Sequence, residues 1–280
     1  MRIKVSLLVA TILLVPLSLL HAQQAAQKKP LDIYFLDTEG GQATLFVSPS
    51  GQSMLVDTGF PGNQGAPPAE ASAPGITRDA DRIMAVLKTA NVSVLDYVVI
   101  THFHGDHAGN AAELAHRIPI RHFVDHGPYT VEMQAGRDAP MLFYMPIREH
   151  AHVMTAKPGD RIPVEGLDVQ VVSSAGEVIK EPMAEAPGAG APNPLCRDAK
   201  LKEQDATPEN FESVGIVVRY GSFRLVDLGD LTWNQEHALA RSFRPCKETR
   251  SVHRHGQYPD HADLQRLRPG DAARIRRHQA

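Results

Sequence analysis

Cysteine and tryptophan are scarce in this sequence of 280 residues. It contains two cysteines, Cys196 and Cys246, and one tryptophan, and aromatic residues make up 6% of the chain. Two isolated cysteines exclude a cysteine-based zinc knuckle. Their spacing does not show whether they form a disulfide, so we assign them no role. Hydrophobic and charged contents of 42% and 22% are ordinary for a globular protein with one large core or two modest ones.

Apolar runs long enough to cross a membrane are also lacking. The apolar stretch Val5–Leu20 has 16 residues and contains Pro16, which makes it short for a span of ~20 residues. Basic residues precede it and Ala22 offers a small residue for cleavage, so residues 1–22 are predicted to be a secretory signal peptide. The alternative is a permanent membrane anchor. We expect cleavage, no permanent membrane span, and a secreted or periplasmic protein.

Acidic residues outnumber basic ones in the chain as a whole, but not in its C-terminal part. Residues 241–280 contain ten Lys and Arg against four Asp and Glu, a local charge of +6. The other 240 residues contain 19 basic and 28 acidic residues, a charge of −9. Tight binding of nucleic acid depends on neutralising phosphates with Lys and Arg. The acidic body therefore argues against nucleic acid as a partner, without excluding it, and we expect a small-molecule or envelope-derived substrate.

One short stretch is rich in side chains that bind metals. Three histidines and one aspartate fall within six residues: His102, His104, Asp106 and His107. Imidazole and carboxylate suit Zn²⁺ and other borderline divalent metals. If the chain leaves a buried strand in extended form, the first two histidines project from the same side. Gly105 then permits a turn that aims the next two side chains at a second point, so one loop could serve two metal ions. The alternative, a His-rich surface loop, requires four positions to match by chance.

The hydrophobic pattern predicts strands and helices in alternation before residue 150. The expected strands are Leu31–Leu36, Ala43–Val47, Met54–Val56, Val92–Ile100 and Ile120–Val124. The expected helices are Asp79–Ala90, a helix from Ala111 that Pro119 ends, and Tyr129–Arg148. Phe60–Ile76 is rich in Pro, Gly and Ala and is predicted to be a loop.

The second half of the chain is predicted to be richer in strands. Arg161–Val164 and Leu167–Val172 have strand-like patterns, and Gly221-Ser222 lies between two apolar runs as in a hairpin. Pro182–Asn210 contains five prolines and is expected to be an irregular insert or a linker. Together these patterns indicate an α/β protein.

Several polar side chains follow predicted strands, where ligands collect in α/β sheets. His126 follows Ile120–Val124 and could be a metal ligand, a substrate contact or a packed loop residue. Asp57 follows Met54–Val56 and Asp230 follows the second strand of the hairpin, and from position alone either could simply be a turn residue.

The histidine motif resembles the metal-binding signature of the metallo-β-lactamase superfamily of metallo-hydrolases. The flanking blocks, including Gly41-Gln42 and an Asn-x-x-Ser block at Asn210 and Ser213, are similar to the branch found in competence (DNA-uptake) proteins. The similarity extends from about Leu31 to about Leu239. The resemblance implies a four-layer αββα sandwich over residues 23–240, with the irregular insert at about 182–210.

The resemblance also implies a site and a reaction. His102 and His104 would hold one metal ion, Asp106 and His107 a second, and Asp230 would bridge both, while Asp106 would also be catalytic by orienting a metal-activated water. Asp57 would support the histidine loop from beneath. The metals implied are two Zn²⁺, with manganese or iron possible in similar sites. The competence-type branch suggests phosphodiesters, whereas other branches open lactams, lactones or thioesters.

The C-terminal residues depart from the family pattern. Residues 241–280 contain nine arginines and no run of three apolar residues, where the family has another buried strand and a histidine loop that completes the second metal site. We expect a basic, disordered or aberrant tail, and interpret the change as truncation or a frame shift that leaves the sandwich incomplete. The alternatives to an exported hydrolase are a noncatalytic metal- or ligand-binding protein and an inactive truncated hydrolase.

Overall fold

The computed structural model describes residues 29–38, 41–62, 78–130, 144–183, 188–193, 199–205, 208–243 and 273–278. The predicted signal peptide and both cysteines lie outside these residues, as does most of the predicted loop at 60–76. Within the described part of the chain, every helix is too short or too polar to span a bilayer.

The first sheet is mixed and has seven strands. They are β1 (Leu31–Leu36), β2 (Thr44–Val47), β3 (Ser53–Val56), β4 (Leu95–Val99), β5 (Ile120–Asp125), β6 (Val153–Thr155) and β12 (Ala273–His278). Their order in the sheet is β12-β1-β2-β3-β4-β5-β6. Strands β3 to β6 are parallel to one another, so their carboxyl ends lie at one edge of the sheet. The histidine loop follows β4, which is close to the middle of this parallel group.

The second sheet is antiparallel. It contains β7 (Arg161–Ile162), β8 (Asp168–Ser174), β10 (Gly215–Tyr220) and β11 (Phe223–Asp227) in the order β11-β10-β8-β7, and β9 (Glu177–Val178) pairs with β8. The turn between β10 and β11 is at Gly221-Ser222, and Tyr220 pairs with Phe223 across it. The predicted hairpin is therefore confirmed.

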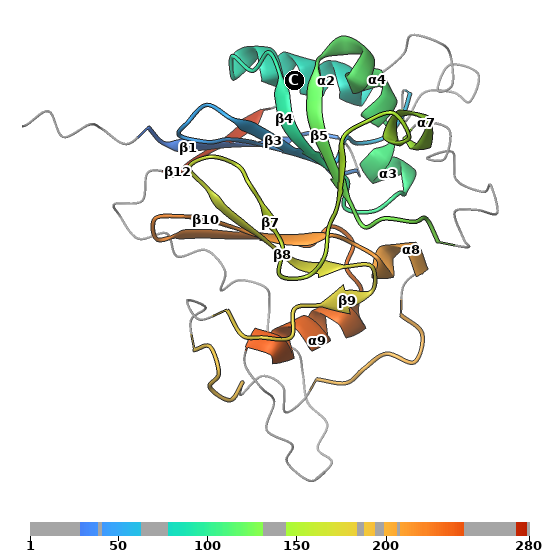
Figure 1. The fold of residues 1–280 in the computed structure, drawn as a ribbon, viewed down its shortest axis with the longest axis vertical. Coiled ribbons are helices and arrows are strands. Elements are labelled where there is room, and N and C mark those ends of the chain that lie inside the picture. The colour runs from blue at the N-terminus through green and yellow to red at the C-terminus, as the bar shows by residue number, and fades with distance from the viewer. Residues whose placement is uncertain are drawn as a thin grey trace, which may run out of the picture.

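Helices cover the outer face of each sheet, which gives four layers (Figure 1). The helices are α2 (Arg78–Thr89), α3 (Gly105–Ala108), α4 (Ala111–Arg117), α7 (Met145–Arg148), α8 (Pro208–Phe211) and α9 (Trp233–Phe243). Helices α2 and α4 pack on the first sheet, where Ile83 and Leu114 join Leu55 and Val98 in one core cluster. Helix α9 packs on the second sheet through Leu239.

The space between the two sheets holds a core of its own. Phe46, Val56 and Val99 from the first sheet meet Val171 and Ile216 from the second, and all five side chains are buried. Each sheet thus buries both of its faces, one against helices and one against the other sheet. The predicted α/β sandwich is confirmed.

Some predicted elements differ from the structure. A helix was expected over Tyr129–Arg148, but Tyr129 and Thr130 are not helical and only Met145–Arg148 forms a helix; residues 131–143 lie outside the described part. Pro146 lies near the start of α7, and proline is compatible with the first turn of a helix. Helix α9 and strand β6 were not predicted.

The tail also contains an element that was not expected. Residues 273–278 form β12, which lies parallel to β1 with Leu31 opposite Ala273 and Leu36 opposite His278. The expectation of an unstructured segment is therefore wrong at these six residues. The strand could not be predicted because its sequence has no apolar run, whereas its backbone pairs with β1 in the structure. Residues 244–272 and 279–280 lie outside the described part.

Candidate metal centre

The histidine loop leaves β4 as extended chain and then turns into α3. Ile100 and Thr101 are buried, and α3 begins at Gly105, so Asp106 and His107 lie within a single helical turn. The side chains of His102 and His104 project from the same side, with His102 Nε2 2.9 Å from His104 Nδ1. This is the arrangement that the spacing predicted.

A second group of side chains gathers around His107. Its Nε2 atom lies 3.6 Å from Oδ2 of Asp106 and 3.4 Å from Oδ1 of Asp230. The rings of His102 and His107 are 4.1 Å apart between centroids. One possible ligand atom from each of His102, His107 and Asp230 lies within 4.8 Å of the others. The structure thus brings together all five residues that the sequence suggested as ligands, from two sheets and about 130 positions apart in the chain.

The cluster opens to solvent on its carboxylate side. His102 and His107 are buried, with side-chain exposures of at most 4%, whereas the side chains of Asp106 and Asp230 are 27% and 44% exposed. A small molecule can therefore approach the cluster past its two carboxylates.

Asp57 supports the histidine loop from beneath. It is fully buried, and its Oδ1 accepts a hydrogen bond from the Thr101 N–H at 2.8 Å. Its Oδ2 accepts one from Thr101 Oγ1 at 2.8 Å and lies 2.7 Å from His107 Nδ1. Because Nδ1 of His107 is engaged in this way, Nε2 faces the cluster. Asp57 has a φ of 59°, a conformation that non-glycine residues rarely adopt and that often marks a functional site.

Two glycines allow other segments to approach this loop closely. A Cβ atom on Gly41 would lie 2.6 Å from the carbonyl oxygen of Asp106, which accepts a hydrogen bond from the Gln42 N–H. A Cβ atom on Gly229 would lie 2.7 Å from the side chain of Thr101, and Gly229 has a φ of 55°. Glycine at these positions therefore brings Asp106 and Asp230 to the cluster.

The electrostatics of the cluster favour a cation. Burial and the nearby charges of His107 and His104 hold the pKa of His102 well below its usual value, so His102 is in the neutral form that can bind a metal ion. Burial lowers the pKa of His107, but Asp57, Asp230 and Asp106 together raise it to about 10. The hydrogen bond from His107 lowers the pKa of Asp230. In the metal-free chain a proton on His107 thus occupies the place that a cation suits, and the donor set fits a divalent metal.

Asp227 is an acidic group near the site that sequence reasoning did not single out. It ends β11, and its Oδ2 accepts a hydrogen bond from Gln42 Nε2 at 3.2 Å. Burial and the charge of Asp57 raise its pKa to about 6. Its place at the end of a strand, three residues before Asp230, was the one signal in the sequence that could have revealed it.

His126 lies behind the histidine loop. Its ring packs against Phe103 with centroids 4.1 Å apart, and its Nε2 is 2.9 Å from Oε1 of Glu209. His126 is thus paired with a carboxylate rather than grouped with the proposed ligands. Glu209, which is fully buried, was not identified from the sequence, because only the fold brings it to residues more than 80 positions away.

Asn210 and Ser213 lie next to Glu209 in the same segment. The backbone carbonyl of Asn210 accepts a hydrogen bond from the Ser213 N–H at 3.2 Å, and the two residues form the turn before β10. The Ser213 side chain is buried, and its hydroxyl has no hydrogen-bond partner among the described residues. Ser213 is thus not joined to the histidine cluster by a side-chain hydrogen bond in the described part of the chain.

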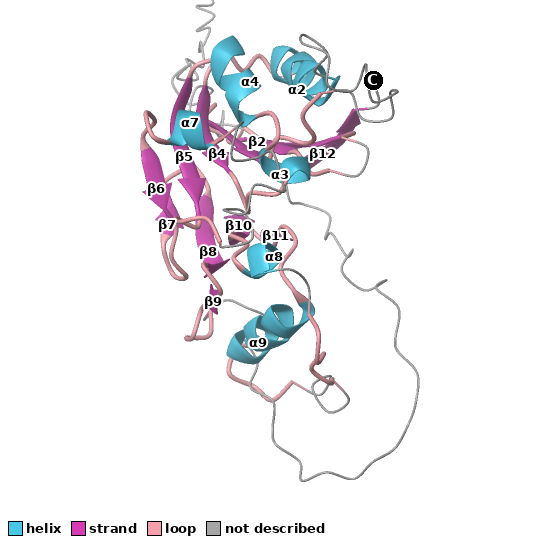
Figure 2. Cartoon of the chain, turned by 90° about the vertical axis from the view of Figure 1, so that its right-hand side faces the viewer, coloured by secondary structure: helices cyan, strands magenta, loops and turns pink. Residues whose placement is uncertain are grey.

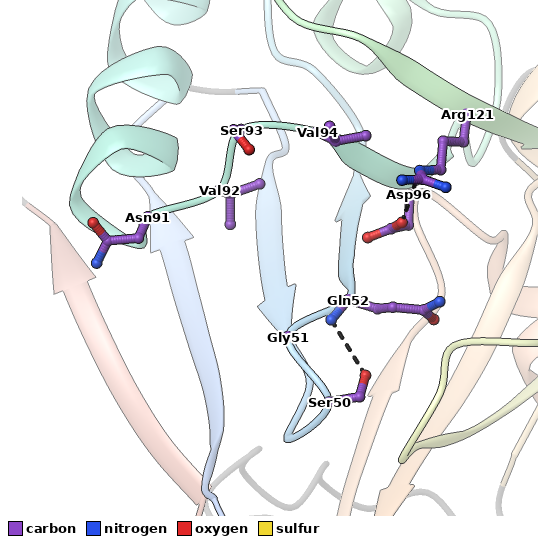
Figure 3. Close-up of a pocket in the computed structure, with 9 residues that line it drawn as sticks. All are labelled: Ser50, Gly51, Gln52, Asn91, Val92, Ser93, Val94, Asp96 and Arg121. Atoms are coloured by element: carbon purple, nitrogen blue, oxygen red, sulfur yellow. Dashed lines mark hydrogen bonds and ion pairs between the residues drawn. The ribbon is translucent and has the colours of Figure 1, made fainter.

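A polar hollow of about 390 Å³ lies away from this cluster (Figure 3). It is lined by the turn at 50–52, by residues 91–94, and by Asp96 and Arg121 at the starts of β4 and β5. The histidine loop follows the opposite end of β4. The hollow therefore plays no part in the candidate centre.

Comparisons with known proteins identify the family. The model described as "Metallo-beta-lactamase superfamily" matches residues 37–194. Similar solved structures include a metallo-beta-lactamase with an HARLDQ motif from Cronobacter sakazakii, at 14% identity, a TM-score of 0.40, and coverage of 72% of this chain and 63% of that one.

Two further structures show likeness at a comparable level. MEM-A1, a subclass B3 metallo-beta-lactamase from a soil metagenome, has 15% identity and a TM-score of 0.40, with 71% and 62% of the two chains covered. Igni18, a metallo hydrolase from Ignicoccus hospitalis, has 15% identity and a TM-score of 0.33, with 72% and 60% covered. This chain thus spans less than two thirds of the length of these structures. No curated protein matches the sequence.

Proposed function

Because this chain belongs to the metallo-beta-lactamase superfamily, we propose that it is a metal-dependent hydrolase that uses a metal-activated water. The observation that carries the proposal is the convergence of His102, His107 and Asp230, whose ligand atoms lie within 4.8 Å of one another. His104 and Asp106 extend this group on either side. Perturbed pKa values such as those of His102 and His107 cluster at functional sites.

The residues divide into two sets of ligands. His102 and His104 would hold one cation, Asp106 and His107 a second, and Asp230 would lie between the two. Zn²⁺ suits this mixture of imidazole and carboxylate, and manganese and iron have similar preferences. A pair of such cations supplies Lewis acidity, which brings the pKa of a water molecule towards ~7.

The remaining steps depend on the side chains of this chain. Asp106 is part-exposed beside His107 Nε2, so its carboxylate can orient the attacking water and accept its proton. Asp57 holds His107 in one tautomer and one orientation through Nδ1. Buried His102 and Phe103 form the wall behind the cluster and keep bulk water out on that side.

For the substrate, we propose a phosphodiester or a related ester-like compound. The support is the similarity of Gly41-Gln42 and of the block from Asn210 to Ser213 to the competence-type branch. In the structure, Gln42 is next to the centre, since its N–H donates to Asp106 and its amide donates to Asp227. The basic start and apolar stretch of residues 1–22 support export, so an envelope-derived compound is a suitable natural substrate.

Metal analysis combined with a generic substrate tests the proposal. The purified protein is expected to contain two metal ions per chain by plasma mass spectrometry and to hydrolyse bis(p-nitrophenyl) phosphate. Asp106→Asn should lower this turnover at least ~100-fold, because a positioned proton acceptor contributes 10²–10⁴-fold. Asp81→Asn, at an exposed carboxylate on α2 that pairs with Arg117, should leave turnover unchanged.

The outcomes separate the function from its substrate. Two metals with turnover of a lactone or thioester, but not of the phosphodiester, would keep the hydrolase and replace its substrate class. At most one metal and no turnover of any of these compounds would contradict the hydrolase itself.

A further inference from the structure

A buried carboxylate behind the histidine loop has no role in the mechanism described above. Glu209 lies in α8, at the end of the sandwich where α3 also lies (Figures 1 and 2). Its side chain has no exposure to solvent. A buried carboxylate is stable only when it is paired and hydrogen-bonded, so its partners indicate what it holds in place.

Three groups from two other segments surround this carboxylate. The Phe103 N–H donates to Oε1 at 2.8 Å, and His126 Nε2 lies 2.9 Å from the same oxygen. The Thr130 hydroxyl donates to Oε2 at 2.7 Å. Burial raises the pKa of Glu209, but the contacts with His126, Thr130 and the Phe103 N–H lower it by more. The net pKa is therefore below its usual value, and the group is an ionised carboxylate.

One of these partners is the residue between the two histidines of the first ligand set. In extended chain, neighbouring side chains point to opposite sides. Phe103 points into the core, where its ring packs against His126 and Tyr144, while His102 and His104 point towards the cluster. Its N–H donor and its ring are therefore both fixed, and the peptide between His102 and Phe103 cannot rotate without breaking a buried hydrogen bond.

His126 completes this arrangement. Its Nε2 faces Glu209, and its buried Nδ1 has no hydrogen-bond partner among the described residues. Glu209 thus provides the one hydrogen-bond partner found for the imidazole among the described residues, and the imidazole in turn packs against the Phe103 ring. The segment that contains Glu209 also binds the loop two residues before Phe103, because the Val214 N–H donates to the Thr101 carbonyl at 2.8 Å.

We propose that Glu209 is a positioning residue that sets the relative directions of His102 and His104 by holding the Phe103 peptide and His126. This inference rests on the proposed function, since it assumes that these two histidines bind a metal ion. It adds a carboxylate from the second half of the chain to the support that Asp57 gives to the other side of the loop. Outer partners of this kind typically change metal affinity 10–100-fold when they are replaced.

The metal alone is the probe for this proposal. Glu209→Gln keeps the shape and one acceptor oxygen but removes the charge. It should weaken Zn²⁺ binding ~10–100-fold in competition with a chromophoric chelator. It should also alter the visible spectrum of the Co²⁺-loaded protein, which reports the geometry around the ion. Asp81→Asn is the control, because it changes an exposed carboxylate on α2 that pairs with Arg117. Its Zn²⁺ affinity and Co²⁺ spectrum should match those of the wild type.

The results distinguish this inference from the proposed function. If the wild type binds neither Zn²⁺ nor Co²⁺, the proposed function fails and this inference fails with it. If the wild type binds both metals and Glu209→Gln binds them within threefold and with the same spectrum, only the inference is overturned. If Glu209→Gln does not fold, Thr130→Val removes one donor to Oε2. A measurable loss of Zn²⁺ affinity in that variant supports the proposal, and an unchanged affinity and spectrum overturn it.

Discussion

At the scale of single residues, the charge of the centre converges on His107. Three carboxylates lie around its ring: Asp57 at Nδ1, and Asp106 and Asp230 at Nε2. In the metal-free chain they raise the pKa of His107 from 6.5 to about 10, although burial acts in the opposite direction. A proton and a metal ion therefore compete for His107, and the stability of the metal-free protein is expected to depend on pH.

The direction of that dependence follows from the raised pKa. A base with a folded-state pKa above its unfolded value adds stability that is fully present below pH 6.5 and is lost as the pH rises through about 10. In the presence of a chelator, the melting temperature should fall by more than about 3 °C between pH 6.5 and 10. In a chain of this size, a shift of about 3 °C corresponds to a loss of roughly 1 kcal/mol of unfolding free energy. Scanning calorimetry measures this, and His107→Gln should show a shallower fall. If the melting temperatures of the wild type and of His107→Gln fall equally with pH, the raised pKa of His107 is not the cause.

Asp227 provides a second test at this scale. Burial and the charge of Asp57 raise its pKa from 3.8 to about 6, so its contribution to stability is present below pH 3.8 and is lost as the pH rises through about 6. Asp227→Asn keeps an acceptor for Gln42 but removes the buried charge. It should raise the melting temperature of the metal-free protein at pH 7.5, and raise it less at pH 4.5. A lower melting temperature at pH 7.5 would show that the charge is needed for folding.

At the scale of elements, the centre depends on loops that follow strands. The histidine loop follows β4, Asp57 follows β3, His126 follows β5 and Asp230 follows β11. The parallel group brings the first three to one edge, and the second sheet brings Asp230 to the same edge. After β11 ends at Asp227, the chain makes a tight turn at Gly229, and this turn directs Asp230 towards His107.

Two glycines of the second sheet allow this turn to be tested against a matched control. Gly229 and Gly221 have φ values of 55° and 56°, but an added Cβ would lie 2.7 Å from Thr101 at Gly229 and would meet open space at Gly221. Gly221→Ala should cost about 1 kcal/mol of unfolding free energy for its conformation alone. Gly229→Ala should cost about 1–3 kcal/mol more, because it also displaces Thr101. Denaturant unfolding measures both, and equal losses would exclude a close approach at Gly229.

At the scale of the whole molecule, the sandwich is held by three cores, one between the sheets and one under the helices on each side. β12 is an edge strand of the first sheet and pairs with β1 along six residues. Without β12, the apolar strand β1 would become the edge and would offer unpaired N–H and C=O groups to other chains.

Removal of β12 tests its contribution. A chain that ends at residue 272 should melt at a lower temperature, aggregate faster, and exchange its β1 amide hydrogens faster than the full chain. A chain that lacks only residues 279 and 280 is the control and should behave as the full chain does. Mass spectrometry of hydrogen exchange over Leu31–Leu36 gives the decisive reading. Unchanged protection of β1 in the shorter chain would mean that β12 does not stabilise this edge.

The sequence by itself determined the local features of this protein. The histidine loop was recognisable because its four ligands lie within six residues, and their directions follow from extended chain and one turn. The helix at α2 and the hairpin at Gly221 were predicted because hydrophobic period and turn chemistry are local. The tertiary structure alone decided which distant groups meet this loop. Asp227 and Glu209, which belong to the second half of the chain, reach it across more than 100 residues. No period or spacing in the sequence records a contact that forms only when two sheets pack face to face.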